Sequence, residues 1–201
     1  YHRAALWLEQ NGHLESAVSY ALKAQNHERA ARLMDQTKDD TGSHGQIRLF
    51  LDWFHTLPDE LVRAHPALCR FYAVCLTIAG YFDDAEVWLR LAEELVSTIT
   101  AADRRAALRA HTIPLYRSVI ARFHGDFAAA VALSQRGLDE VPDTLIRDRG
   151  VALLFLGHAH FYAGNTETAE KVLLDAIQCN LASGHMTAYL NACHHFAQLR
   201  V

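Results

Sequence analysis

The segment Ile78-Ala79-Gly80-Tyr81-Phe82-Asp83-Asp84-Ala85 joins two stretches of helical sequence through a short polar turn. A glycine can end a helix in the left-handed conformation because it has no Cβ to clash with the backbone. An alanine five residues later lets the next helix approach the previous one closely. The same spacing occurs at three other places, Gly12/Ala17, Gly125/Ala130 and Gly164/Ala169. Four such turns predict a series of αα-hairpins, and consecutive hairpins stack into a solenoid.

Helical periodicity covers most of the sequence, and no stretch has the sustained alternation of β-branched residues that is typical of a strand. Pro114 should kink the helix predicted at 101–123 or shift its start to about residue 113. Asp143 is expected to cap the helix that follows Pro142. We therefore predict an all-α protein with helices at residues 2–11, 14–24, 27–37, 46–56, 59–64, 66–79, 82–98, 101–123, 126–140, 143–163, 166–183 and 186–201.

The repeat is longer than a standard tetratricopeptide repeat of 34 residues, since 45 residues separate Gly80 from Gly125 and 39 separate Gly125 from Gly164. Small residues nevertheless occupy the positions where the two helices of each repeat should pack closely. These are Ala73, Ser118 and Gly157 in the first helices, and Ala92, Gly137 and Ala176 in the second. The predicted fold is a right-handed, tetratricopeptide-like superhelix of αα-hairpins.

Composition and charge narrow the functional classes. The 201 residues are 51% hydrophobic and 21% charged, which is typical of a globular protein. A net charge of −4 without a run of basic residues argues against a nucleic-acid surface. The apolar stretches are too short to span a bilayer, and the N-terminal residues have no signal-peptide pattern.

The four cysteines lie in apolar helical stretches and form no CxxC pair, so we expect reduced thiols in a cytoplasmic protein: Cys69, Cys75, Cys179 and Cys193. The chain begins at Tyr1 rather than at methionine, and its last helical pattern runs to Val201. We therefore expect it to be a segment of a longer protein.

Two segments carry a more specific pattern. Residues 2–12 read HRAALWLEQNG and continue through AVSYAL at 17–22 to ERAARL at 28–33, and residues 53–69 read WFHTLPDELVRAHPALC. In order and spacing these segments resemble the large LuxR-type transcription activators related to the maltose regulator MalT. The resemblance covers residues 1–95, and the remainder matches as generic repeat. Phe54 stands where leucine is usual in the family, and His27 stands where aspartate is common.

Members of this family are signal-transduction ATPases, in which a nucleotide-binding module precedes a helical sensor and a helix-turn-helix domain binds promoter DNA. The chain contains no GxxxxGK[ST] motif and no basic recognition helix. The resemblance therefore implies that residues 1–40 are a helical arm following a winged-helix segment. Residues 41–201 would be the superhelical sensor domain, incomplete at its C-terminus. ATP binding, DNA binding and self-association would be properties of the parent protein.

Catalytic and metal-binding patterns are missing from the sequence. Among thirteen histidines, the only clusters are His158-x-His160 and His194-His195. Neighbours at i+1 and i+2 point to different faces of a helix, so they cannot share a metal ion. No GxSxG motif occurs, and no serine or cysteine has a supporting base. We expect no enzymatic activity, no metal site and no cofactor in this segment.

The first helix of each repeat lines the concave face in tetratricopeptide geometry, so we place the candidate binding site there. Val74, Ile78, Leu115, Val119 and Leu154 are expected on the same face. Cationic, polar and aromatic side chains together suit a polar ligand that has an apolar or ring face. The predicted ligand-binding residues are Arg70, Thr77, Arg122, Phe123, His158, Phe161, Tyr162, Asn191 and His195.

The leading hypothesis is a regulatory sensor segment of a transcription activator. It would bind a small inducer or a partner protein on the concave face and thereby shift the parent between resting and self-associating states. The alternative is a tetratricopeptide-type scaffold that binds a peptide. For the binding site itself, the alternative is that the predicted residues are solvated side chains of the concave face, with the true site beyond Val201.

Overall fold

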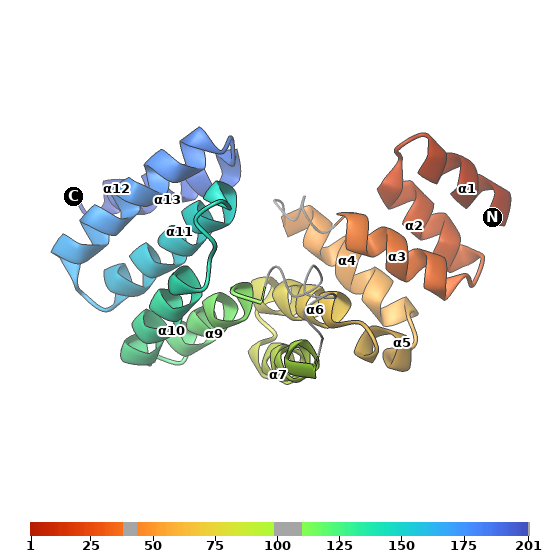
Figure 1. The fold of residues 1–201 in the computed structure, drawn as a ribbon, viewed down its shortest axis with the longest axis horizontal. Coiled ribbons are helices and arrows are strands. Elements are labelled where there is room, and N and C mark those ends of the chain that lie inside the picture. Colours follow the sequence, from red (N-terminus) through yellow and green to blue (C-terminus); the bar gives the residue numbers. More distant parts are fainter. Residues whose placement is uncertain (38–43, 99–109, 201) are drawn as a thin grey trace. The chain divides into compact units, whose positions relative to one another are not determined.

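The computed structural model describes residues 1–37, 44–98 and 110–200, and this part of the chain is helical with no strand (Figure 1). The prediction of an all-α protein is confirmed. The helices are α1 (His2–Gln10), α2 (Leu14–Lys23), α3 (His27–Thr37), α4 (His44–Thr56), α5 (Asp59–Arg63), α6 (Pro66–Ala79), α7 (Phe82–Thr98), α9 (Thr112–Phe123), α10 (Phe127–Asp139), α11 (Ile146–Tyr162), α12 (Thr166–Ala182) and α13 (Met186–Gln198).

Helices α9 and α11 begin later than the sequence predicted or at the alternative start. Helix α9 begins at Thr112, so Pro114 lies in its first turn, where a missing N–H breaks no intrahelical bond. Residues 99–109, which include the predicted start at 101, lie outside the described residues. Helix α11 begins at Ile146, and the prediction that Asp143 caps it is wrong. The Leu145 N–H bonds the Pro142 carbonyl at 2.9 Å, and this turn delays the helix.

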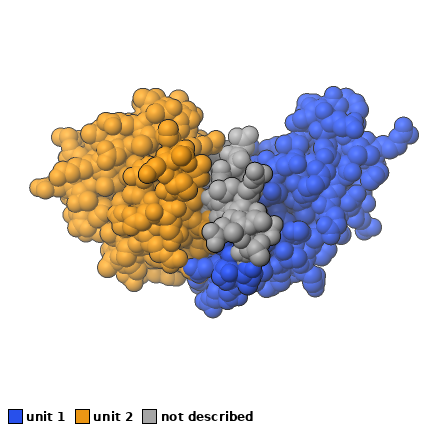
Figure 2. Space-filling model, viewed as in Figure 1, with its two compact units in different colours: residues 1–108 blue, residues 109–201 orange. Residues whose placement is uncertain are grey.

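The chain forms two compact units, Tyr1–Leu108 and Arg109–Val201, which Figure 2 colours separately. In the first unit α6 contacts α3, α4, α5 and α7. In the second unit α11 contacts α9, α10, α12 and α13. The boundary predicted near residue 40 falls within residues 38–43, which lie outside the described residues, and it stays a prediction.

A left-handed residue closes each of six turns between consecutive described helices. The four predicted glycines adopt this conformation, with φ of 77° at Gly12, 87° at Gly80, 80° at Gly125 and 76° at Gly164. In each turn the next N–H bonds the carbonyl five residues earlier, at 2.9 to 3.0 Å, which is the Schellman motif. The bonded pairs are His13 to Leu8, Asn26 to Ala21, Tyr81 to Leu76, Asp126 to Ala121, Asn165 to His160, and His185 to Asn180.

The Gly/Ala spacing in the sequence did not predict two of these turns. Gln25 has φ of 54°, and the fully buried Ala30 follows it five residues later. The turn therefore has the predicted geometry, with glutamine in place of glycine. At Gly184 (φ of 69°) the buried alanine is Ala188, four residues on instead of five.

Close packing between the helices depends on the small residues. The four alanines that follow the predicted glycines are completely buried: Ala17, Ala85, Ala130 and Ala169. A Cβ added to Gly157 would lie 2.6 Å from the Leu173 Cδ2 atom, and one added to Gly137 would lie 2.5 Å from the Leu115 Cδ2 atom. A side chain at either glycine position would therefore require the facing leucine to move.

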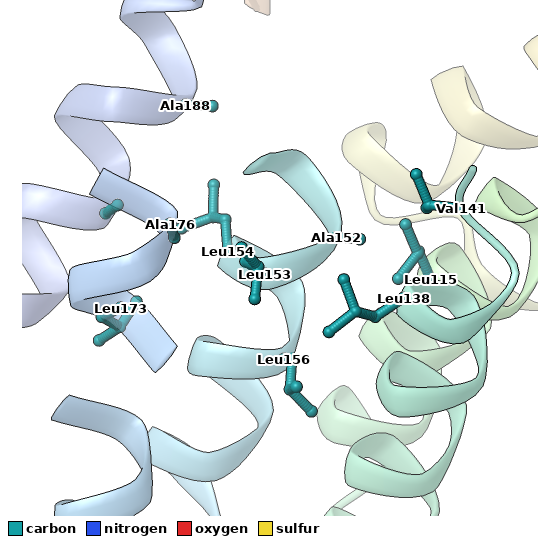
Figure 3. Packing of buried hydrophobic residues seen from close by; sticks show 11 residues of the cluster. Leu115, Leu138, Val141, Ala152, Leu153, Leu154, Leu156, Leu173, Ala176 and Ala188 are labelled. Carbon is teal, nitrogen blue, oxygen red and sulfur yellow. The ribbon is translucent and has the colours of Figure 1, made fainter. Parts of the chain in front are cut away.

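The core of the second unit is a cluster of leucines around α11. Figure 3 shows Leu115 and Leu138 on one side of α11, and Leu173 with Ala176 on the other. Leu115 and Leu154 are 1% and 6% exposed, so the prediction that they lie on an open face is wrong. These side chains fill the space between the helices and fix the positions of α9, α11 and α13 relative to one another.

Ala130→Leu and Ala169→Leu should each lower the free energy of unfolding by about 1–3 kcal/mol, because extra methylenes would overpack a completely buried site. Ala128→Leu is the control, since Ala128 is exposed on the same helix as Ala130. Urea unfolding measures all three. Equal stability of the buried and exposed variants would contradict the helix register described above.

Gln25→Gly should raise the free energy of unfolding by about 1 kcal/mol relative to Gln25→Ala. Both variants remove the same polar side chain, but only glycine relieves the steric cost of a Cβ at positive φ. Urea unfolding of the two variants gives the difference. An alanine variant as stable as the glycine variant would show that residue 25 is not held in the left-handed conformation.

Candidate functional site

Seven of the nine predicted binding residues lie on three helices of the second unit, and α11 contacts both of the others. The C-terminal ends of α9 and α11 are closed by the turns at Gly125 and Gly164, and the two helices are in contact. The residues are Arg122 and Phe123 on α9, His158, Phe161 and Tyr162 on α11, and Asn191 and His195 on α13.

Side chains from α11 and α13 meet at a pair of imidazoles. The ring centres of His158 and His195 are 3.9 Å apart, with an angle of 45° between the ring planes. Phe161 lies edge-on to His195 at 5.6 Å, and Tyr162 lies 6.4 Å from the same imidazole. We call the set of Arg122, Phe123, His158, Phe161, Tyr162 and His195 the ring strip.

Arg122 connects α9 to this group. Its Cζ atom lies 4.5 Å from the centre of the Tyr162 ring and 4.9 Å from that of Phe123, both within cation–π distance. Burial lowers the pKa of Arg122, and the interaction with Tyr162 opposes this shift. Among the described residues, no carboxylate forms an ion pair with the Arg122 guanidinium.

His158 is the most perturbed group of the strip. Its Nε2 atom is buried and has no hydrogen-bond partner. The pKa of His158 is lowered to about 3, mainly by burial and then by the charges of His195, Arg122 and His194 in that order. His158 is therefore neutral at physiological pH, with a buried polar atom that the protein leaves unsatisfied.

His195 has a defined tautomer when it is neutral. Its Nδ1 atom lies 3.1 Å from the backbone carbonyl oxygen of Asn191, which can only accept, so Nδ1 carries the hydrogen and Nε2 has the free lone pair. Burial lowers the pKa of His195, and this hydrogen bond opposes the shift. Asn191 itself is exposed, and its Nδ2 atom donates to the Thr187 carbonyl at 3.2 Å.

The other two predicted residues, Arg70 and Thr77, are not on an open face. They are 8% and 3% exposed on α6, and the Thr77 hydroxyl donates to the Ala73 carbonyl at 2.8 Å. The prediction that they are accessible is wrong because other helices cover α6 on several sides. Every residue from 68 to 77 except Tyr72 is buried. The nearly uninterrupted apolar run in this helix is the sequence signal of such burial.

A groove in the first unit was not predicted. It has a volume of about 960 Å³ and is lined by α4, α5, α6 and α7. Its polar lining includes Arg48, Asp52, His55, Asp59 and Arg63. Sequence periodicity marks the faces of single helices, but this groove is lined by residues of four helices.

Aromatic rings form the wall of the groove. Tyr72 stacks on Phe54 at 4.5 Å and tilts against Trp88 at 5.0 Å. The Arg63 guanidinium carbon lies 4.8 Å from the centre of the Trp88 ring. Burial raises the pKa of Tyr72, and the carboxylates of Asp59 and Asp84 raise it further.

Comparisons with protein-family models, with curated proteins and with solved structures each found no match for this chain. Over residues 1–37, 44–98 and 110–200, no group of three or more histidine, cysteine, aspartate or glutamate side chains is arranged to hold a metal ion. No described helix combines the length and apolar character needed to cross a membrane.

His158 should make the folded chain sensitive to acid. Its pKa is about 3 when folded and near the ordinary value of about 6.5 when unfolded, so the unfolded chain binds more protons between these values. This group therefore lowers the free energy of unfolding as the pH falls below 6.5, by up to about 1.4 kcal/mol per pH unit. Urea unfolding at pH 7, 6 and 5 should show a steeper loss for the wild type than for His158→Leu. Parallel losses would contradict this assignment.

Proposed function

We propose that this chain is the sensor segment of a transcription regulator and that it binds a small ligand on the ring strip. The αα-hairpins of each unit would belong to a tetratricopeptide-like superhelix, with α9, α11 and α13 as the ligand-facing helices. The regular left-handed turns and the buried small residues at the helix contacts support this arrangement. The resemblance of residues 1–95 to MalT-related activators supports the regulatory role. The segment would be cytoplasmic, with nucleotide and DNA binding in other parts of the parent.

The observation that carries the proposal is the buried, unpartnered Nε2 atom of His158 within the ring strip. A buried polar atom without a partner costs about 1–3 kcal/mol, so a protein retains such an atom where something else satisfies it. A ligand that hydrogen-bonds to His158 would recover this free energy. Around the same point, Phe161 and Tyr162 offer ring surfaces and Arg122 offers hydrogen-bond donors.

A thermal-shift screen of small metabolites tests this function. A ligand that binds only the folded chain stabilises it by about 2.7 kcal/mol at a concentration 100 times its dissociation constant. Arg122→Ala and His158→Ala should weaken the binding of any hit by about tenfold or more, because each removes a hydrogen-bonding group from the strip. Urea unfolding of each variant is measured alongside, because both side chains pack against rings of the strip and a loss of binding must be separated from a loss of stability.

Arg48→Ala is the matched control, because Arg48 is an exposed arginine that lines the groove of the first unit. Hits of the ring strip should keep their affinity in this variant. Hits that lose affinity in Arg48→Ala and keep it in both strip variants would contradict the choice of site.

The second candidate function is a scaffold that binds a peptide. The groove of the first unit favours it, because its length over α4 to α7 and its mixed charges suit an extended segment better than a compact metabolite. Under this function, small molecules would leave the melting temperature unchanged, and a bound peptide would lose affinity in Arg48→Ala.

A further inference from the structure

The ring strip gathers cationic and neutral groups with no opposing carboxylate. The groups that act on His158 are Arg122 from α9, and His194 and His195 from α13. Tyr162, on the same helix as His158, interacts with Arg122. Helices α10 and α12 also pack on α11, but none of the groups that shift the pKa of His158 lies on either of them. A guanidinium and three imidazoles therefore lie together without a counter-charge among the described residues.

Placing these groups together destabilises the folded chain unless an anion binds among them. A guanidinium that is partly removed from water normally pairs with a carboxylate or a phosphate, because the ion pair offsets the lost hydration. Arg122 contacts the rings of Phe123 and Tyr162 and hydrogen-bonds to Tyr162, and neither of these neutral partners supplies a counter-charge. The unpartnered Nε2 atom of His158 lies in the same strip. It can donate a hydrogen bond to an anion when it carries the ring hydrogen.

We infer that the ligand of the ring strip is an organic anion with an aromatic or apolar body. Its acidic group would bind Arg122 and the paired imidazoles of His158 and His195, and its body would lie against Phe161 and Tyr162. This inference rests on the proposed function, because it names the chemical class of the ligand at the same site.

The inferred ligand makes binding depend on pH. In the free chain, burial and neighbouring cations lower the pKa of both His158 and His195. A bound anion favours the protonated imidazole, so it raises these pKa values and takes up a proton. If one imidazole returns to its ordinary pKa of about 6.5 in the complex, the affinity rises about fourfold between pH 8 and pH 6.

The test compares 2-naphthalenesulfonate with its neutral isostere 2-naphthalenesulfonamide, by calorimetric titration of the whole chain. The sulfonate keeps its charge across this pH range, so any pH dependence comes from the protein. The sulfonate should bind about tenfold tighter than the sulfonamide or better, and its affinity should rise as the pH falls. Arg122→Gln should remove the preference for the sulfonate, and Arg48→Gln should not.

Equal binding of the two probes, with loss of both in His158→Leu, would overturn the anionic class and leave the proposed function standing. A preference for the sulfonate that survives Arg122→Gln and disappears in Arg48→Gln would assign the anion to the other unit, and would overturn both. Binding of neither probe would reject the anionic ligand. The metabolite screen would then decide the proposed function separately.

Discussion

The structure depends on a left-handed residue in each of six turns between consecutive described helices. A helix leaves its last carbonyls without partners, and the Schellman hydrogen bonds satisfy them only when the following residue has positive φ. The turn also fixes where the next helix starts, and a completely buried alanine then sets how closely it can pack. Helices α9 and α11 each end in such a turn and are in contact, and the Cζ atom of Arg122 of α9 lies 4.5 Å from the ring centre of Tyr162 of α11.

The ring strip gathers partly buried polar groups that the fold itself does not need. Core stability comes from the leucine cluster around α11, to which neither Arg122 nor His158 belongs. Both side chains carry a desolvation cost, seen in the lowered pKa of each. Polar groups that add cost to the folded state without a partner in the chain are typical of binding sites, where a ligand supplies the missing interaction. The ring strip therefore differs from the leucine core, whose side chains stabilise the fold by packing against one another.

Helix positions and turns could be predicted well from the sequence, because glycine at positive φ and alanine at a helix contact leave local signals. Gln25 gave no such signal, because a glutamine in the left-handed conformation cannot be distinguished in the sequence from any other polar turn residue. The exposure of Arg70 and Thr77 was mispredicted because burial depends on how many helices cover α6. The pairing of His158 with His195 joins residues 37 positions apart, so neighbour spacing along one helix could not show it.

The central claim is that ligands bind where α9, α11 and α13 meet, and histidine-ring NMR tests it most directly. Two-dimensional spectra of the ring nitrogens would be recorded with and without a ligand found by thermal screening. The account predicts that the His158 and His195 signals move on binding while that of His55, in the groove of the first unit, stays in place. Movement of His55 alone, with both strip histidines unchanged, would contradict it.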